Sequence, residues 1–369
     1  MLNPTYEIPS LPPKGINFET IDILKALSEA HRYLAEVKGR AIAIPNQSIL
    51  IDSLALQEAK ASSEIENIVT TQDELFKSDL YSATLLKGPT KEVSLYRQAM
   101  KLGFREIHRQ KGLITNNTLI KIFQLLKQRN DGFRSSMGTV LSNEQTGQTV
   151  YVPIQNPAEI VTQMSELEKF INNDDLYKLD PLIKMAIIHH QFESIHPFPD
   201  GNGRIGRMLN ILYLTRYGLL ETPILYLSRK INQTKSDYYR LLQTVRNDGA
   251  WEEWVIYMLQ AVSETSQTTL LLIDGIRELM ARFKTIIRND YPNIYSQDLI
   301  NNLFRHPYTR IEFLQRDIGK TRQTASKYLE RLASSESDIL IKRQIGRDVY
   351  FINRPLVDLF MSVSADQTQ

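Results

Sequence analysis

One short segment of the chain, HPFPDGNGRIGR over residues 196–207, gathers side chains that can perform nucleotide chemistry. Gly201 and Gly203 allow the backbone to approach an anion closely, and amide groups at the start of a following helix bind phosphate well. Arg204 and Arg207 are three residues apart, so both can reach phosphate oxygens from the first helical turn. The segment therefore predicts a site for a polyphosphate.

The same segment also carries a metal ligand and a base. Asp200 is a hard oxygen ligand of the kind that Mg²⁺ uses together with substrate phosphates. His196 is the one side chain of the segment that can accept a proton near neutral pH. A structural helix start with solvated charges is the alternative, since the segment is neither a Walker A loop nor a dinucleotide-binding loop. The combination of His196 and Asp200 with the glycines favours nucleotide chemistry on an activated hydroxyl.

The segment resembles the HxFxDGNGRxxR signature of the Fic family of AMP-transferring enzymes. The fixed positions of that signature are met by His196, Phe198, Asp200, Gly201, Asn202, Gly203, Arg204 and Arg207. The resemblance implies that AMP is transferred from ATP to a Ser, Thr or Tyr hydroxyl of a target protein or of the enzyme itself. It further implies that His196 deprotonates the hydroxyl, Asp200 holds Mg²⁺, and Arg207 steers the γ-phosphate.

The resemblance implies that more distant segments complete the nucleotide site. Residues 236–254 predict a helix that ends near Gly249, and Tyr239 and Asn247 on it would close the adenine and ribose side. Aromatic residues at helical spacing are as often part of a core, so that interpretation stays open for Tyr239. The implied ATP-binding set is Glu66, Val150, His196, Asp200, Gly201, Asn202, Gly203, Arg204, Ile205, Gly206, Arg207, Tyr239 and Asn247.

Two helices are expected to position the loop. Apolar residues recur at helical spacing over 181–195, so this helix would deliver His196 at its end. After the loop, Ile205 and Leu209 share one face of a second helix that stops near Gly218. The loop should therefore join two core helices.

A β-hairpin is predicted upstream, where residues 138–153 alternate β-branched and polar side chains around Gly147. In the Fic fold such a flap lies beside the catalytic loop and aligns the target by strand addition. Only Val152–Pro153 stands where many relatives carry two prolines, and a surface hairpin without this role is the alternative. The residues expected to dock the target are Thr149, Val150, Tyr151 and Val152.

A helix with a regulatory motif is predicted near the N-terminus, over residues 48–68. Ser62 and Glu66 are neighbours on its surface, and Asn67 follows. These three residues fit the self-inhibition motif of Fic proteins, in which a Ser or Thr is followed four residues later by Glu and then by Gly or Asn. The resemblance implies that Glu66 pairs with Arg207, so that ATP binds in an unproductive pose.

Several alternatives for this chemistry stay open. Glu66 can also orient a water that removes AMP from a target, which would make the protein a bifunctional AMP transferase and de-AMPylase. Glu64 points to the opposite face and is expected to be dispensable. Transfer of a phosphoryl group is a second alternative, and a nucleotide-sensing DNA-binding regulator is a third. The intact His196 and Asp200 argue against a sensor without activity.

A histidine metal site is a weaker interpretation of the same region. His189, Glu193 and His196 lie at intervals of four and three, which would align them on a continuous helix. Pro197 ends that helix, however, so structural roles are favoured for His189 and Glu193.

The composition is that of an ordinary globular protein. The chain has 369 residues, 42% of them hydrophobic and 23% charged, with a net charge of +2. This balance excludes a general polycation, and the absence of cysteine excludes disulfides and thiolate sites. No leader or apolar run of membrane-spanning length is visible, so a cytoplasmic protein without membrane contact is expected.

A change of pattern near residue 290 predicts a C-terminal domain. Segments 297–304, 310–317 and 321–333 indicate three short helices, and a hairpin with its turn at Gly346–Arg347 follows. This order resembles a winged helix-turn-helix domain in which Thr321 caps the recognition helix. Residues 320–347 carry a local charge of +4, so DNA binding is one hypothesis and protein docking or dimerisation the other.

The expected fold class is mainly α, with a helical Fic domain, a small β-hairpin flap and a winged helix-turn-helix domain. The predicted boundaries are 1–95 for an N-terminal helical region with the inhibitory helix, 96–285 for the catalytic domain, and 290–369 for the C-terminal domain. A homodimer is compatible with this organisation.

Overall fold

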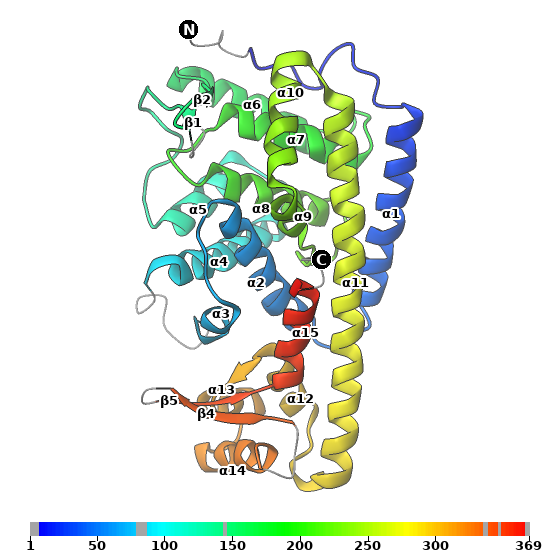
Figure 1. The fold of residues 1–369 in the computed structure, drawn as a ribbon, viewed down its shortest axis with the longest axis vertical. Helices are drawn as coiled ribbons and strands as arrows, with labels where there is room; N and C mark the ends of the chain where they lie inside the picture. The colour runs from blue at the N-terminus through cyan, green and yellow to red at the C-terminus, as the bar shows by residue number, and fades with distance from the viewer. Residues whose placement is uncertain (1–6, 79–86, 143–145, 335–338, 346–347, 366–369) are drawn as a thin grey trace.

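The computed structural model describes residues 7–78, 87–142, 146–334, 339–345 and 348–365. The described chain is mainly helical with two small antiparallel sheets, which confirms the expected fold class. Its longest element, α11 (Trp251–Asp290), runs along one side of the molecule, and α1 (Ile21–Ala41) lies beside it (Figure 1). None of the described helices combines the length and apolar character that crossing a lipid bilayer requires.

The central helices are α7 (Pro181–Ile195) and α8 (Asn202–Arg216), which confirms the two predicted core helices. Pro181 occupies the first turn of α7, where a missing amide costs nothing. Gly218 follows the end of α8 with a φ of 68°, a left-handed conformation that glycine adopts without strain. Around them lie α4 (Gly88–Arg109), α5 (Asn116–Lys127), α6 (Pro157–Asn172), α9 (Leu227–Gln233) and α10 (Lys235–Asp248).

The predicted regulatory helix is α2 (Gln47–Ile65), most of whose side chains are buried. It ends three residues before the predicted boundary because Asn67 adopts a left-handed φ of 58°. The amide of Ile68 then turns back to donate to the carbonyl of Ser63 at 3.0 Å, which closes the helix end. Glu66 therefore stands just beyond the last helical residue, and Asn tolerates the left-handed position after it.

The predicted flap is a short antiparallel hairpin formed by β1 (Leu141–Ser142) and β2 (Thr149–Tyr151). Leu141 pairs with Tyr151, and Gly147 has the positive φ of 67° that the expected turn requires.

The C-terminal region has the predicted order of three helices and a hairpin. The helices are α12 (Gln297–Arg305), α13 (Ile311–Ile318) and α14 (Arg322–Leu332), and the hairpin strands are β4 (Ile341–Ile345) and β5 (Asp348–Ile352). The turn predicted at Gly346–Arg347 lies outside the described residues. Thr321 caps α14 by accepting a hydrogen bond from the amide of Thr324 at 3.2 Å, as expected.

Two elements of this region were not predicted. A short strand, β3 (Tyr308–Thr309), adds to β5 and completes a three-stranded sheet in the order β3-β5-β4. A last helix, α15 (Arg354–Ala365), packs on α11, where Leu359 lies against Gly275. Helices α12 (Gln297–Arg305) and α15 attach the C-terminal region to the long helix (Figure 1).

Contacts join the C-terminal region to both sides of the regulatory segment. Arg305 of α12 donates to Asp52 of α2 at 2.8 Å. Phe76 of α3 (Gln72–Ser78) stacks on Tyr308, with 5.8 Å between the ring centroids, and also contacts Phe360. The segment that carries Glu66 is therefore bracketed by two contacts with the C-terminal region.

Basic side chains of this region are partly neutralised within it. Arg322 pairs with Glu312, and Lys342 pairs with Glu330 at 2.6 Å. Glu330 is already part of the charge counted over residues 320–347, whereas Glu312 lies outside that range and offsets one further positive charge, that of Arg322.

Candidate active site

The predicted catalytic loop connects α7 directly to the N-terminus of α8. His196 ends α7 in a left-handed conformation with a φ of 50°, so the chain turns away from the helix axis there. Asn202 closes the loop with two hydrogen bonds to the backbone of Phe198, at 2.8 and 2.7 Å. Gly201, with a φ of 77°, precedes the first turn of α8. The loop is thereby held rigid around a helix N-terminus.

The side chain of Asn202 has a structural task in the loop, whereas the expected contact of Asn202 with ATP stays a prediction. Both polar atoms of the amide bind the loop backbone, and the residue is buried. Phe198 is also buried and stacks on Phe123, with ring centroids 4.6 Å apart. Together these contacts shape the loop, and the side chain of Asn202 is occupied in that task.

His196 lies among cationic groups that favour its neutral form. Burial, with the nearby charges of Arg134 and Arg246, lowers the pKa of His196 to about 4. The Arg134 side chain donates to the carbonyl of His196, and its amide donates to the carbonyl of Pro197, both at 2.8 Å. At neutral pH the imidazole is therefore unprotonated and able to accept a proton.

The pair expected between the regulatory helix and the loop is present. The Arg207 guanidinium donates to the Glu66 carboxylate at 2.7 Å. It also donates to the hydroxyl and to the carbonyl of Ser62, each at 2.8 Å. Burial alone would raise the pKa of Glu66, but Arg207 outweighs it, so the net shift is downward and the pair is ionic.

Two glycines of α8 make room for buried carboxylates. A methyl group on Gly203 would come within 2.4 Å of a Glu66 oxygen and 2.9 Å of an Arg207 nitrogen. A methyl group on Gly206 would come within 2.5 Å of a Glu193 oxygen. The Glu66 carboxylate thus occupies the space above the first turn of α8, where amide groups and the helix dipole favour an anion.

The other expected phosphate ligand, Arg204, is also paired. It donates to Glu92 of α4 at 2.7 Å and is almost completely buried. Asp200 is 59% exposed and binds Lys127 of α5 at 2.5 Å. Burial tends to raise the pKa of Asp200, but the hydrogen bond and charge of Lys127 lower it overall.

The flap residues divide between two environments. Thr149 and Val150 are exposed, the latter by 45%, and face away from the core. Tyr151 is buried, donates its hydroxyl to the Ser194 carbonyl at 2.8 Å, and lies under the Arg246 guanidinium. Val152 is partly buried. Tyr151 therefore anchors the flap beside the end of α7, and the exposed strand residues remain available to another chain.

The residues expected on the adenine side lie on α10. Tyr238 belongs to the core, where its hydroxyl contacts His189 Nε2 at 2.9 Å. Its neighbour Tyr239 is 45% exposed, and Asn247, also exposed, accepts a hydrogen bond from Gln243 at 3.1 Å. Of the two tyrosines, Tyr239 is the one whose ring is accessible to a ligand.

The alternative metal ligands are used in packing. His189 contacts Asn210 through Nδ1 at 3.1 Å, and its ring stacks on Trp254. Burial lowers the pKa of His189 to about 3 and raises that of Glu193 to about 7. Among the described residues, no three His, Asp or Glu side chains are grouped as metal ligands.

Sequence reasoning missed three charged residues of the site: Arg134, Lys127 and Glu92. Each belongs to a segment far from the loop in sequence and carries no motif. Arg134 joins the loop to the flap, because it also donates to the carbonyl of Ile154. The sequence gives no local pattern that marks these three residues as part of the site. The partner of a charged residue beside an apolar helix face is decided only by how the helices pack.

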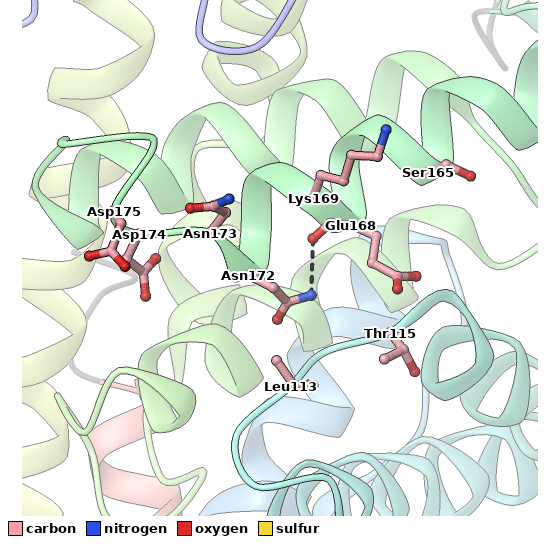
Figure 2. A pocket seen from close by; sticks show the side chains of 9 residues that line it. All are labelled: Leu113, Thr115, Ser165, Glu168, Lys169, Asn172, Asn173, Asp174 and Asp175. Atoms are coloured by element: carbon pink, nitrogen blue, oxygen red, sulfur yellow. Dashed lines mark hydrogen bonds between the residues drawn. The ribbon is translucent and has the colours of Figure 1, made fainter.

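A separate open cleft of about 690 Å³ lies beside the C-terminal end of α6, and Figure 2 shows its side chains. None of the predicted site residues lines it. Asp174 within it is already paired with Lys184 at 2.8 Å and with Arg216 at 3.0 Å. The lining residues are Leu113, Thr115, Ser165, Glu168, Lys169, Asn172, Asn173, Asp174 and Asp175.

Comparison with known families agrees with this architecture. The model described as Fic/DOC family N-terminal matches residues 24–105, and that of the Fic/DOC family matches residues 113–214. A third, described as the C-terminal domain of SoFic-like protein adenylyltransferases, matches residues 279–356. With its loop, its regulatory helix and these three matches in order, the chain belongs to the Fic family.

Curated relatives share only part of this chain. A protein adenylyltransferase of Caenorhabditis elegans, fic-1, is 30% identical over 110 residues, which are 29% of this chain and 20% of that protein. The Caenorhabditis briggsae protein of the same name is 27% identical over 144 residues, 38% of this chain and 25% of the relative. The matched part thus spans a quarter or less of these relatives.

Solved structures share the fold over a larger part. A Fic family protein from Desulfovibrio desulfuricans superposes with a TM-score of 0.56 at 19% identity, covering 90% of this chain and 96% of that one. A Fic domain containing signaling protein from Bacteroides thetaiotaomicron gives a TM-score of 0.53 at 17% identity, covering 68% and 97%. The arrangement of helices is therefore shared well beyond the loop.

Proposed function

We propose that this protein is an adenylyltransferase that transfers AMP from ATP to a Ser, Thr or Tyr hydroxyl of a protein, itself included. The observation that carries the proposal is the loop before α8, in which a neutral imidazole lies a few residues before a helix N-terminus with glycines at 201 and 203. Curated relatives named protein adenylyltransferase support it. ATP is the substrate, and the phosphates lie over Gly201, Gly203 and Arg207.

The reaction needs one base and one anion site. His196, neutral because its pKa is about 4, accepts the proton of the target hydroxyl. The hydroxyl oxygen forms a bond to the α-phosphorus as the bond from that phosphorus to the bridging oxygen of the β-phosphate breaks. Pyrophosphate leaves with that oxygen. Amide groups of the first turn of α8 stabilise the negative charge throughout.

The residues around Asp200 fit a magnesium site of the usual kind at phosphates. Asp200 offers one largely exposed carboxylate beside the phosphate cradle, and Mg²⁺ in proteins takes one or two carboxylates, with phosphates and water as its other ligands. When bound, the ion neutralises phosphate charge. Asp200 supplies the protein ligand, and Lys127 must give up its contact with this carboxylate.

We propose that Glu66 restrains the activity. Its carboxylate neutralises Arg207 and fills the space above Gly203, so it competes with phosphate for the same cation and the same amide groups. An ATP molecule that cannot reach Arg207 lacks the contact that aligns its phosphate chain. The chain therefore carries both the catalyst and its inhibitor.

The exposed strand residues Thr149 and Val150 support flap docking of the target, with main-chain pairing to an extended segment. Tyr239, exposed beside the loop helices, is the proposed nucleotide contact on α10, and Asn247 a polar one.

The test is transfer of label from ATP carrying radioactive phosphorus at the α position. A Glu66→Gly variant is incubated with this ATP and Mg²⁺, alone and with cell lysate, beside a Glu66→Gly, His196→Ala double variant. We expect label on protein from the single variant, and a loss of about 100-fold or more in the double variant.

A second donor separates the reaction classes. ATP labelled at the γ position should leave protein unlabelled, because only AMP is transferred. Label from the γ-phosphate with none from the α-phosphate would instead establish phosphoryl transfer. Equal labelling by the single and double variants would remove His196 from the reaction and contradict the proposal.

A further inference from the structure

Lys127, Asp200, Glu92 and Arg204 form a chain of alternating charges at the mouth of the loop. The Lys127 ammonium lies 2.5 Å from Asp200 and 3.9 Å from Glu92. Glu92 in turn binds Arg204 at 2.7 Å. Resting on the proposed function, we infer that Lys127 and Glu92 are positioning residues, which exchange partners when a divalent cation binds Asp200 and thereby release Arg204 for the phosphates.

The geometry favours exchange over a fixed structural role. Lys127 is the last residue of α5, and its stem lies 3.4 Å from the position that a Cβ on Gly201 would take. Its head group therefore stays near the loop whichever carboxylate it binds. The side chain of Lys127 is 18% exposed and that of Asp200 is 59% exposed, so the ion pair is open to solvent on the Asp200 side, where a divalent cation can displace the ammonium.

Among the described residues, Glu92 is the second carboxylate that lies near the Lys127 ammonium. A divalent cation at Asp200 repels the Lys127 head group, and Glu92 is the carboxylate already beside it. Glu92 then pairs with both Lys127 and Arg204, which weakens its ion pair with Arg204. Arg204 is almost fully buried and its Nε has no hydrogen-bond partner among the described residues, so it gains by turning to a phosphate.

This exchange explains a discrepancy between sequence and structure. The family signature makes Arg204 a phosphate ligand, whereas the structure has it bound to Glu92. In the proposed sequence of events, the arrival of the metal converts Arg204 from the structural partner of Glu92 into a phosphate ligand. Lys127 connects the two sites, because in the described part of the chain it is the cation that pairs with Asp200.

The experiment measures the magnesium dependence of nucleotide binding. Fluorescent N-methylanthraniloyl ADP is titrated onto full-length Glu66→Gly protein at a series of Mg²⁺ concentrations, with anisotropy as the readout. Adding Lys127→Met should lower the half-saturating Mg²⁺ concentration about fivefold, the factor equivalent to one exposed ion pair. Adding Glu92→Gln should raise it, because Lys127 then has only Asp200 to bind.

Lys121→Met is the matched control, because Lys121 lies on the same helix and pairs with Glu106 at 2.8 Å away from the loop. It should leave the magnesium dependence unchanged. If Lys127→Met weakens binding at saturating Mg²⁺ with an unchanged half-saturating concentration, Lys127 is a phosphate ligand and the inference is overturned. A lower melting temperature without any shift also overturns it. If the Glu66→Gly parent binds no nucleotide, the proposed function itself has failed.

Discussion

Two arginines on the same face of α8 meet two carboxylates in different ways. Arg207 and Arg204 are 1% and 2% exposed, and each lies 2.7 Å from its acid. Arg207 also has two acceptors on Ser62, so its guanidinium is held from three directions. Arg204 has Glu92 alone, and its Nε has no partner in the described part of the chain.

The two ion pairs differ in what remains when the acid leaves. If Glu66 leaves, Arg207 still keeps the hydroxyl and carbonyl of Ser62, so the buried cation stays partly satisfied. If Glu92 leaves, Arg204 keeps nothing comparable. The first pair is therefore suited to control activity at a small cost in stability, and the second contributes stability until a ligand replaces the acid.

The largest expected effect follows from removing the acid of the first pair. Glu66→Gly should raise the rate of AMP transfer by about 5- to 150-fold, the range typical of a single regulatory coupling. Initial rates of self-labelling with α-labelled ATP measure it. Glu166→Gly is the control and should give no increase, because Glu166 pairs with Lys169 on α6 away from the loop. A Glu66→Gly rate at or below that of the unaltered protein would contradict the comparison.

Removing the acid of the second pair should affect stability. Glu92→Ala leaves a buried guanidinium unpaired, so the free energy of unfolding should fall by about 1–3 kcal/mol. Glu66→Ala should cost less, since Ser62 remains. Urea unfolding followed by circular dichroism measures both variants, and the comparison fails if Glu66→Ala is the more damaging of the two.

Weakening the first pair without removing its charge should give an intermediate result. Ser62→Ala deletes the hydroxyl that accepts from Arg207 at 2.8 Å and leaves the Ser62 carbonyl in place. One lost hydrogen bond is worth about 1 kcal/mol, so the transfer rate should rise about fivefold or less. A rise as large as that of Glu66→Gly would mean that Ser62 carries the restraint.

The pH dependence of the transfer rate should reflect the lowered pKa of His196. Its pKa is lowered from 6.5 to about 4, so the imidazole is neutral above pH 5 and becomes charged only as the pH falls through about 4. Glu66 raises that pKa in part, so its removal cannot move the acid limb upward. Rates of the Glu66→Gly variant from pH 5 to 8 should show no titration of His196. A transfer rate that falls on acidification with an inflection near pH 6.5 would refute this.

The smallest effect is expected at Glu64, two residues before Glu66. Glu64 pairs with Lys60 at 2.5 Å and accepts from Asn232 at 3.2 Å, away from Arg207. Glu64→Gln should leave the transfer rate unchanged and alter the free energy of unfolding by less than about 0.5 kcal/mol. The same two assays apply, and an activation by Glu64→Gln would show that any charge change on α2 releases the enzyme.

Local patterns predicted the helices well, because caps and apolar spacing act over a few residues. The ends of α7 follow from Pro181 and from the turn at His196, and the contact between Glu66 and Arg207 followed from the family motif. The length of α11 and the existence of α15 could not be predicted in this way. Gly275 in the middle of α11 is unfavourable for a helix, and only the packing of Leu359 of α15 against it explains its place there.

The site was predictable where residues lie together in sequence. The segment 196–207 places eight polar or glycine positions within twelve residues, so its chemistry is visible without the fold. Lys127 and Glu92 are single charges on helices whose approach depends on how α4, α5 and α8 pack. The occupied state of Arg204 and the structural use of Asn202 likewise depend on neighbours far apart in the chain.

In the proposed mechanism, the end of α2 sets the timescale on which Glu66 can leave Arg207. Glu66 follows the last helical residue, and the turn that holds it depends on the bond from Ile68 to Ser63. Helix ends open and close in nanoseconds to microseconds, whereas withdrawing the buried body of α2 would require nearly global unfolding. The proposed restraint would therefore act as a rapid local equilibrium. A partner that binds the open turn would find it exposed many times in each proposed catalytic cycle, without withdrawing the helix.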